Sequence, residues 1–503
     1  MASDYLYGTQ AKLGDSIVKA SKSLGRIAVA IGTSPVNLVR GYASQGLVNK
    51  PIKLTTAKAK STIGYSKDWK HFTLSEVVKA FFDNAGGNVE PLYVINILDP
   101  DKHRKADATK QTLTFVNGQA SFASDTIILD TLAIADKAEG VDYTVDYNMT
   151  TGKVVIDSNS AQAKLNGAVE VTYNEVDHSF MEDNDDKAEA LVGAISATGV
   201  RSGLQALDLV YMKYFVVCNY LIAPGFTHLP AVRNAMVAKV QKFNDMFDAM
   251  AYTDIPTDED TGNVIDTRAK AIAWKNTNNY KSEREVVNYP KARDSENNVY
   301  HLSTLRCVEQ LRRDQANNCI PYETAGNKTV AIVASPFVSD GIDIDGYTRG
   351  EANELSQNGI STLIPWEGVF KLWGHHTSAY TYGGTYDARA IFDTSINMLL
   401  YLMNSYTKEH ADEIDKPMKL SLKQDIEDLE NRKLRELVSI GALLEDPDGE
   451  SPTFKFIPEN NPSGDIIEGY FRWDLGATPT PPFASGTAVV AYTDAGFKAY
   501  MEE

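Results

Sequence analysis

The sequence predicts an α/β protein of several domains, α+β in its overall mixture, with extended N- and C-terminal arms. Strand-like runs rich in β-branched residues alternate with amphipathic helical segments, which favours a parallel or mixed sheet covered on both faces. A block of short strands interrupts this alternation, and a proline-rich linker precedes the last residues. The chain has 503 residues. That length suggests roughly three or four domains of about 100–200 residues.

The first quarter of the chain predicts an arm followed by a compact α/β unit. Residues 1–25 are polar and lack periodicity, whereas residues 26–100 predict the first part of an α/β domain. Arg26–Gly32 and Leu92–Leu98 predict two buried strands. Between them, Thr73-Leu-Ser-Glu76 has the spacing of a capping box, in which the Thr hydroxyl and the Glu carboxylate satisfy amides at a helix start.

Residues 101–176 predict a small all-β domain inserted into this α/β domain. The strand-like runs are short and are separated by turn signals at Asn117-Gly118 and Thr151-Gly152. The expected strands are Thr112–Val116, Ser121–Leu129, Tyr143–Tyr147, Lys153–Ile156 and Ala168–Tyr173.

Residues 177–374 predict the second part of the α/β domain. A helix is expected near Ala188–Ala197, and strands are expected at Tyr214–Val217 and Lys328–Ala334. A long helix is expected between these strands, because apolar residues recur on one helical face. These residues are Val232, Met236, Val240, Phe243, Phe247 and Met250.

Residues 375–483 predict a C-terminal globular domain. Ser421-x-x-Gln424 has the spacing of a capping box, so we expect it to open a helix, and Gly441 is expected to end that helix. Thr478–Pro482 then predicts a stiff, extended linker.

Residues 484–503 predict an arm that holds one isolated strand. The strand has no hairpin partner in the sequence and consists of Thr487, Ala488, Val489, Val490, Ala491 and Tyr492. An isolated strand leaves its backbone groups unpaired. Addition to the sheet edge of another subunit would pair them, so we expect strand exchange.

Charge and cysteine content exclude several classes of protein. The formal net charge of −18 disfavours wrapping a nucleic acid or a membrane surface, because both carry negative charge. Three cysteines form no CxxC pair, which fits a reducing compartment. The polar N-terminus has no apolar signal-peptide core, and the apolar stretch Leu207–Ala223 is too short to span a membrane. We expect a soluble protein made in the cytosol.

Three fragments resemble parts of a serine protease triad, but their order is wrong. Gly32-Thr-Ser34 comes first, Asp260-Thr-Gly262 second and Gly374-His-His-Thr377 last, whereas a subtilisin-type triad requires Asp, His and Ser in that order. Pro35 follows Ser34 and removes a backbone donor that the helix of a nucleophile would use. We expect no catalytic residues.

Metal and cofactor sites are not predicted either. His375 and His376 are adjacent, so they project in different directions, and no carboxylate or Cys at ligand spacing accompanies them. Asp340–Glu351 superficially resembles a calcium loop, but with Gly346 as the required glycine the first and twelfth ligand positions both fail. The sequence contains neither GxxxxGK[ST] nor GxGxxG, and its basic residues do not cluster with aromatic ones. We expect no cofactor, no metal and no direct nucleic-acid contact.

The stretch from residue 355 to residue 377 resembles the signature of contractile phage tail sheath proteins. In that family an L-x-x-x-G-I-N-like turn leads into a strand, and a W-G-x-R-T-like element follows at the junction with the C-terminal domain. The matching residues are Leu355, Asn358, Gly359, Ile360, Gly368, Trp373, Gly374 and Thr377. The chain has Ser361 where Asn is common and His376 where Arg is common, which puts the contact of that Arg in doubt.

Shorter elements that resemble the family occur in the family's order along most of the chain. They are Gly32–Pro35, Phe81–Gly87, Gly203–Leu207, Leu221–Gly225, and the group Arg389, Phe392 and Ile396.

The resemblance implies a subtilisin-like α/β sheath domain without a protease active site, followed by an α+β C-terminal sheath domain. It also implies that subunits stack as hexameric rings around a tail tube, exchange strands from both arms, and contact the baseplate and tail terminator proteins. Contraction of these rings would drive the tube through the target cell envelope. The implied location is a virion tail, assembled in the host bacterial cytoplasm without membrane insertion. A headless R-type bacteriocin or other contractile injection system is the alternative, and an α/β hydrolytic enzyme is a distant one.

Overall fold

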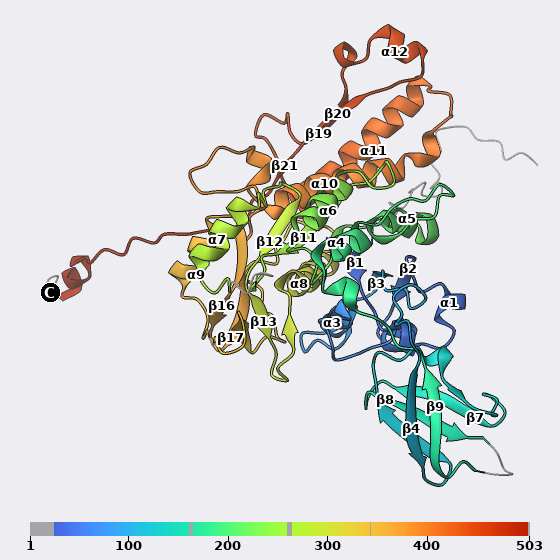
Figure 1. Ribbon diagram of the computed structural model, residues 1–503. Helices are drawn as coiled ribbons and strands as arrows, with labels where there is room; N and C mark the ends of the chain where they lie inside the picture. Colours follow the sequence, from blue (N-terminus) through green and yellow to red (C-terminus); the bar gives the residue numbers. More distant parts are fainter. Residues whose placement is uncertain (1–24, 160–163, 259–263, 343, 501–503) are drawn as a thin grey trace, which may run out of the picture.

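The computed structural model describes residues 25–159, 164–258, 264–342 and 344–500, and its centre is a mixed β-sheet (Figure 1). Among these residues, eight strands form the sheet in the order β17-β16-β12-β11-β10-β1-β3-β2. The strand β2 is antiparallel to β3 and β17 is antiparallel to β16, and the strands between them run parallel. The bounds are β1 Ala28–Gly32, β2 Pro51–Leu54, β3 Leu92–Asn96, β10 Tyr220–Ile222, β11 Met250–Asp254, β12 Glu285–Asn288, β16 Ile360–Trp366 and β17 Val369–Trp373.

Helices cover both faces of this sheet. The helix α3 lies between β2 and β3 in the chain, and the helix α6 joins the parallel strands β10 and β11. The first of these, α3, contacts α8, and the second, α6, contacts α4. The bounds are α3 Thr73–Phe82, α4 Asn184–Val192, α5 Asp208–Tyr214, α6 Pro230–Gln241, α7 Arg268–Thr277, α8 Leu302–Ala316 and α9 Arg349–Ser356. Shorter elements are α1 Tyr42–Gln45, α2 Ala59–Ile63, β13 Lys291–Arg293, β14 Val299–Tyr300 and β15 Ser335–Phe337.

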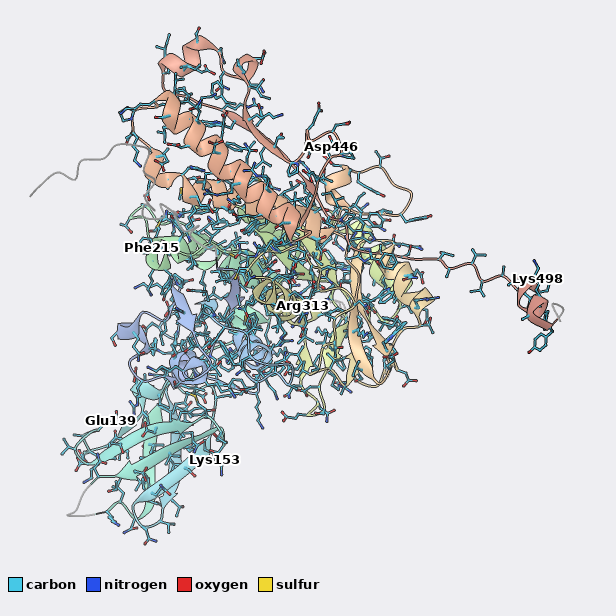
Figure 2. All side chains as sticks on the ribbon, turned by 180° about the vertical axis from the view of Figure 1, so that it is seen from behind. Glu139, Lys153, Phe215, Arg313, Asp446 and Lys498 are labelled. Atoms are coloured by element: carbon cyan, nitrogen blue, oxygen red, sulfur yellow. The ribbon has the colours of Figure 1, made fainter. Side chains whose placement is uncertain are left out.

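Six strands between residues 109 and 173, β4 to β9, form two antiparallel sheets that project from the rest of the protein (Figures 1 and 2). One sheet has the order β4-β9-β6 and the other β5-β8-β7, and their buried side chains form a hydrophobic cluster apart from that of the main sheet. The bounds are β4 Thr109–Phe115, β5 Gln119–Ala123, β6 Ala133–Ile134, β7 Tyr143–Asn148, β8 Lys153–Ser158 and β9 Gly167–Tyr173. All five expected strands in this stretch are present with shifted bounds. The largest shift is in β5, which ends at Ala123, six residues before the expected end at Leu129.

The C-terminal part packs two long helices against two small antiparallel sheets of two strands each. The sheets pair β18 with β21 and β19 with β20, and a hydrophobic cluster joins them to both helices. The bounds are α10 Asp393–Glu409, α11 Leu420–Ser439, β18 Leu443–Leu444, β19 Thr453–Phe456, α12 Ser463–Ile467, β20 Trp473–Gly476 and β21 Thr478–Pro479. The expected stop at Gly441 is confirmed, because α11 ends just before it and Gly441 has φ +78°.

Two predicted strands are wrong. Residues 214–217 do not form one, because α5 occupies the first of them and the strand pairing with β1 begins only at Tyr220. Lys328–Ala334 is not a strand either. It lies along the outer edge of β17, where Val330 donates to the Phe370 oxygen, and then turns. Only Val330 in this run is buried, so its apolar residues do not mark a sheet interior.

The predicted extents of two helices also require correction. The long helix α6 ends at Gln241, because Asn244 and Asp245 both adopt left-handed backbone conformations, and Met250 begins β11. The helix expected near Ala188–Ala197 is α4, which ends before Gly193. Apolar residues recur at helical spacing past the end of α6 because Phe243 and Phe247, in the turn that follows the helix, are also buried.

Both predicted capping boxes are wrong, and part of the predicted linker is paired. The helix α3 begins at Thr73 itself, and the Glu76 carboxylate accepts hydrogen bonds from His301 instead. The helix α11 begins at Leu420 without a side-chain cap, so Ser421 does not open it. Within the predicted linker, β21 pairs with β18, which anchors the start of the C-terminal segment to the body.

Candidate functional site

The residues of the family signature lie together where the main sheet meets the C-terminal part. They occupy the end of α9, the hairpin of β16 and β17, and the turn after β17. Leu355 and Ile360 are buried, and the Trp373 indole donates a hydrogen bond of 2.8 Å to Asn353 in α9. Thr377 is buried and donates to the backbone oxygen of Ala390.

Two signature glycines are required by close backbone approaches. Gly359 has φ +65°, and a Cβ atom there would lie 2.7 Å from the backbone oxygen of Thr377. Gly374 has φ +127°, and its Cβ atom would lie 3.0 Å from the Cα atom of Ser361. Both positions therefore exclude ordinary side chains on conformation and on space.

A buried arginine connects this region to the C-terminal part. Arg306 of α8 donates to the Ser361 hydroxyl (2.6 Å), to the Gly374 oxygen (3.0 Å) and to the Asp393 carboxylate (2.6 Å), which opens α10. The side chains of Arg306 and Asp393 are both 0% exposed. A charge pair this deeply buried is costly to break, because one partner alone would remain unpaired in a low-dielectric interior. We call this set of contacts the domain junction.

Position 376, where tail sheath proteins commonly have Arg, is occupied by His376 in this chain. The His376 ring donates through Nδ1 to the Ile391 oxygen at 2.8 Å, and it stacks on Tyr380 with ring centroids 3.6 Å apart. The guanidinium at the junction therefore comes from Arg306, which sequence reasoning missed. The sequence offered one signal for this role, because Arg306 lies beside the apolar residues Leu305 and Val308, which are buried in the same helix.

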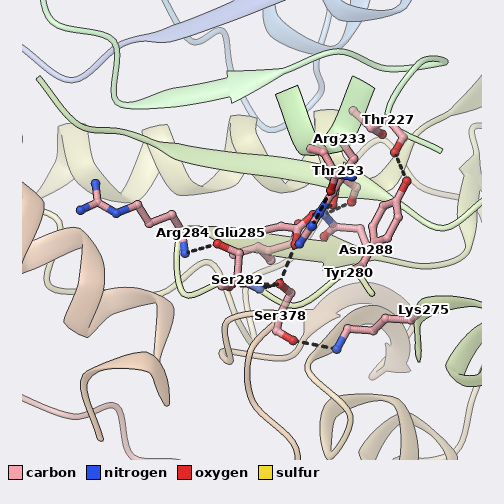
Figure 3. A network of polar contacts seen from close by, with 12 residues as sticks. Thr227, Arg233, Thr253, Lys275, Tyr280, Ser282, Arg284, Glu285, Asn288 and Ser378 are labelled. Atoms are coloured by element: carbon pink, nitrogen blue, oxygen red, sulfur yellow. Dashed lines mark hydrogen bonds and ion pairs between the residues drawn. The ribbon is translucent and has the colours of Figure 1, made fainter. Parts of the chain in front are cut away.

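A second polar network holds the turn after β17 against the sheet (Figure 3). Glu285 of β12 accepts hydrogen bonds from Arg233 (2.8 Å for Nε), from the Thr253 hydroxyl (2.8 Å) and from the Ser378 hydroxyl (2.7 Å). The Lys275 ammonium donates to the backbone oxygens of Asn358 and Ser378, each at 2.7 Å. Burial lowers the pKa of Lys275 to about 8. Both signature turns are thus fixed to the centre of the fold.

The start of the described chain is fixed in the same manner. Arg26, which precedes β1, donates to the Asp314 carboxylate at 2.9 Å and to the Tyr220 hydroxyl at 2.6 Å. The Tyr220 hydroxyl in turn donates to Asp314 at 2.6 Å. The N-terminal arm predicted over residues 1–25 lies outside the described residues, apart from Gly25.

The predicted exchange strand has no partner within the described residues. The segment extends away from the body of the protein, and the 3-10 helix Ala495–Tyr500, which contains Lys498, follows it (Figures 1 and 2). Val489 is 90% exposed and Val490 is 92% exposed. No hydrogen bond links residues 487–492 to the described part of the chain. Their role in pairing with another subunit therefore stays a prediction.

Two of the three fragments that resemble a protease lie in the described residues. Ser34 is buried, and its hydroxyl donates to the backbone oxygen of Ile63. Asp260 lies outside the described residues. Burial lowers the pKa of His375 and of His376 to about 4, and both rings pack beside Phe392.

No metal or membrane element is found in the described ranges. Among those residues no group of three His, Cys, Asp or Glu side chains could hold a metal ion. In the segment that superficially resembles a calcium loop, Glu351 forms a capping box with Thr348 at the start of α9. The described helices include none that is long and apolar enough to cross a membrane.

Comparison with known proteins connects this geometry to one family, although no family model matches the sequence. The chain is 25% identical to the tail sheath protein of Burkholderia phage BcepMu, over 96% of this chain and 95% of the relative. It is 24% identical to a putative prophage major tail sheath protein of Pseudomonas aeruginosa (strain UCBPP-PA14), over 61% of this chain and 73% of the relative. The fold resembles the helical sheath of the anti-feeding prophage in its contracted state, with a TM-score of 0.53, 11% identity, and coverage of 97% of this chain and 100% of that one.

The α/β fold of the chain thus resembles that of a contractile sheath. Nearly the whole chain is similar to a phage tail sheath protein, and this similarity supports the contractile tail sheath family.

Proposed function

We propose that this chain is the structural subunit of a contractile tail sheath, which polymerises around a tail tube and contracts. The observation that carries the proposal is the similarity to a phage tail sheath protein over 96% of the chain. The unpaired C-terminal segment supports it, because a polymer subunit requires a group that is satisfied only by a neighbour. We propose no catalytic role, no cofactor and no metal.

The assembly that we infer is a stack of hexameric rings, in which Thr487–Tyr492 adds to the sheet edge of a neighbour. Each main-chain hydrogen bond so formed contributes roughly 0.5–1.5 kcal/mol net. Full burial of Val489 contributes roughly 1.5–3 kcal/mol more. These gains exceed the cost of ordering a segment whose start is already anchored by β21. Partners beyond self would be the tail tube, baseplate and tail terminator proteins, in a virion tail assembled in the bacterial cytoplasm.

The domain organisation that we propose follows the sequence prediction. Residues 26–100 and 177–374 form a subtilisin-like sheath domain, 101–176 an inserted β domain, and 375–483 the C-terminal sheath domain. Projection of 109–173 from the body supports an outward position of the insertion on the tube (Figure 1). Replacing residues 101–176 with a short Gly/Ser bridge should leave a soluble, folded chain by circular dichroism. An insoluble or unfolded product would place this region in the core of the fold.

Electron microscopy of the purified full-length protein tests the function. We expect long, striated tubes under polymerising conditions. A protein that stays monomeric under every such condition would contradict a sheath role.

A second candidate within the same mechanism is the sheath of a headless R-type bacteriocin or another contractile injection system. The fold similarity to an anti-feeding prophage sheath favours it. The presence of capsid genes beside this gene would support the phage reading, and their absence would support the second candidate.

A further inference from the structure

A cavity of about 550 Å³ opens at the carboxyl edge of the main sheet, away from the domain junction. Its walls come from the turns after β10 and β11, from the N-terminal ends of α3 and α8, and from β13 and β15. Strand order reverses at β1, which has β3 on one side and β10 on the other. In open α/β sheets, the crevice outside the strand ends at such a reversal is the usual place for a ligand.

The acidic side chains inside this cavity are already satisfied by the protein. Glu76 accepts hydrogen bonds from the His301 backbone amide and from its ring Nδ1, each at 2.7 Å. Asp254 accepts from the Ser303 amide at 2.9 Å and from its hydroxyl at 2.5 Å. The other two acids of the lining, Asp258 and Asp340, are exposed. The cavity therefore has little acceptor capacity to offer a cation.

The basic side chains of the cavity are less well satisfied. Lys291 is half-buried and Lys67 is exposed, and neither forms an ion pair with any described residue. His228 makes no side-chain hydrogen bond to the described residues. Its pKa is lowered well below the usual value by burial above all, and then by Lys187, Lys291 and His301. Two lysines of the lining, Lys67 and Lys291, are thus left without an acidic partner among the described residues.

One neutral donor in the lining is also left without a partner. Thr257, in the turn after β11, is 0% exposed, and its hydroxyl has no hydrogen-bond partner among the described residues. Buried polar groups are nearly always paired, so an unpaired one calls for a ligand or a water molecule. Trp69 and Phe337 complete the lining with apolar surface.

We propose that this cavity binds a small molecule that carries a phosphate monoester. Lys291 and Lys67 supply charge to the phosphate oxygens, as lysine does in other phosphate sites. The ring of His228 and the Thr257 hydroxyl donate hydrogen bonds to the phosphate oxygens. Trp69 and Phe337 contact the organic part of the ligand.

Calorimetric titration of the full-length protein tests this proposal, with inorganic phosphate and phenyl phosphate as probes at matched ionic strength. We expect saturable binding of both, with phenyl phosphate tighter. Lys291→Gln should weaken phosphate binding by about tenfold, the usual effect of one charged hydrogen bond. Lys242→Gln is the matched control, because Lys242 is exposed and follows α6 at the opposite edge of the sheet. It should leave binding unchanged.

A second variant tests the site without changing its charge or destabilising the fold. Thr257→Val keeps the shape of the side chain, so the ligand-free protein should melt at an unchanged or higher temperature while phosphate binding weakens severalfold. Absence of saturable binding by either probe, or equal weakening in Lys291→Gln and Lys242→Gln, would overturn the proposal. Binding of inorganic phosphate with no gain for phenyl phosphate would overturn the assignment of an organic ligand. The decisive readout is the affinity of Thr257→Val beside wild type.

Discussion

The polar groups of the domain junction are paired within the chain, whereas the backbone groups of the C-terminal segment are not paired with any described residue. At the junction, Arg306 and Asp393 are fully buried and find each other within the same chain. In the segment after Pro482, Val490 is 92% exposed, and the backbone of Thr487–Tyr492 finds no partner among the described residues. The junction is therefore paired within one chain, whereas the segment is left unpaired, as the proposed strand exchange requires. Changes at the two places should affect different measurements.

Truncation after Phe483 should have the largest effect, and on assembly alone. The shortened chain loses the whole candidate strand but no contact of the body, so we expect unchanged thermal unfolding and no stable sheath. Sedimentation under polymerising conditions measures this. A chain ending after Tyr492 is the control, because it retains the strand and lacks only the terminal 3-10 helix. Normal tubes from the chain ending at Phe483 would rule out strand exchange.

Replacement at the junction should lower stability instead. Arg306→Met leaves Asp393 buried without its partner, which should reduce the free energy of unfolding by about 3–5 kcal/mol. Arg389→Met is the control, because its pair with Glu283 is largely exposed and should contribute only about 0.2–1 kcal/mol. Urea unfolding followed by circular dichroism separates the two. Equal losses in both variants would show that the junction is not a special contact.

Acid should weaken the junction before it affects the C-terminal segment. The pKa values of His375 and His376 fall from 6.5 to about 4 on folding, mainly because of burial. Between these values the unfolded chain binds protons that the folded chain does not, so stability is lost as pH falls from 6.5 towards 4. We expect the melting temperature to drop across this window, and to drop less in His376→Gln. The chain truncated after Phe483 should show the same pH dependence as wild type.

The smallest effect is expected at the fragment that resembles a protease nucleophile. Ser34→Ala removes one buried hydrogen bond, to Ile63, and should cost about 0.5–1.5 kcal/mol. Tube formation should be unchanged in electron micrographs. Stoichiometric labelling of Ser34 by a serine-reactive probe would contradict its structural role.

Features that depend on neighbouring residues are predicted well from the sequence, whereas features that depend on contacts between distant residues are not. Strands β1 and β3 were found because a short apolar run bounded by turn residues is a local signal. The capping box at Thr73 failed because Glu76 is recruited by His301, which lies 225 positions away. Arg306 escaped notice for the same reason, since Asp393 is 87 positions away. The exchange strand at Thr487–Tyr492 is predicted from the lack of a nearby partner strand in the sequence, and it stays a prediction.

The anchoring of Arg26 has a mechanical consequence. A pull on the N-terminal side of Arg26 acts first on a buried side chain bonded to Asp314 and Tyr220, and then along the axis of β1. Because β1 lies between β10 and β3 and is parallel to both, such a load shears two ladders of hydrogen bonds at once instead of opening them one by one. We therefore expect tension applied there to be shared across the middle of the sheet, through the pairing of β1 with β10 and with β3.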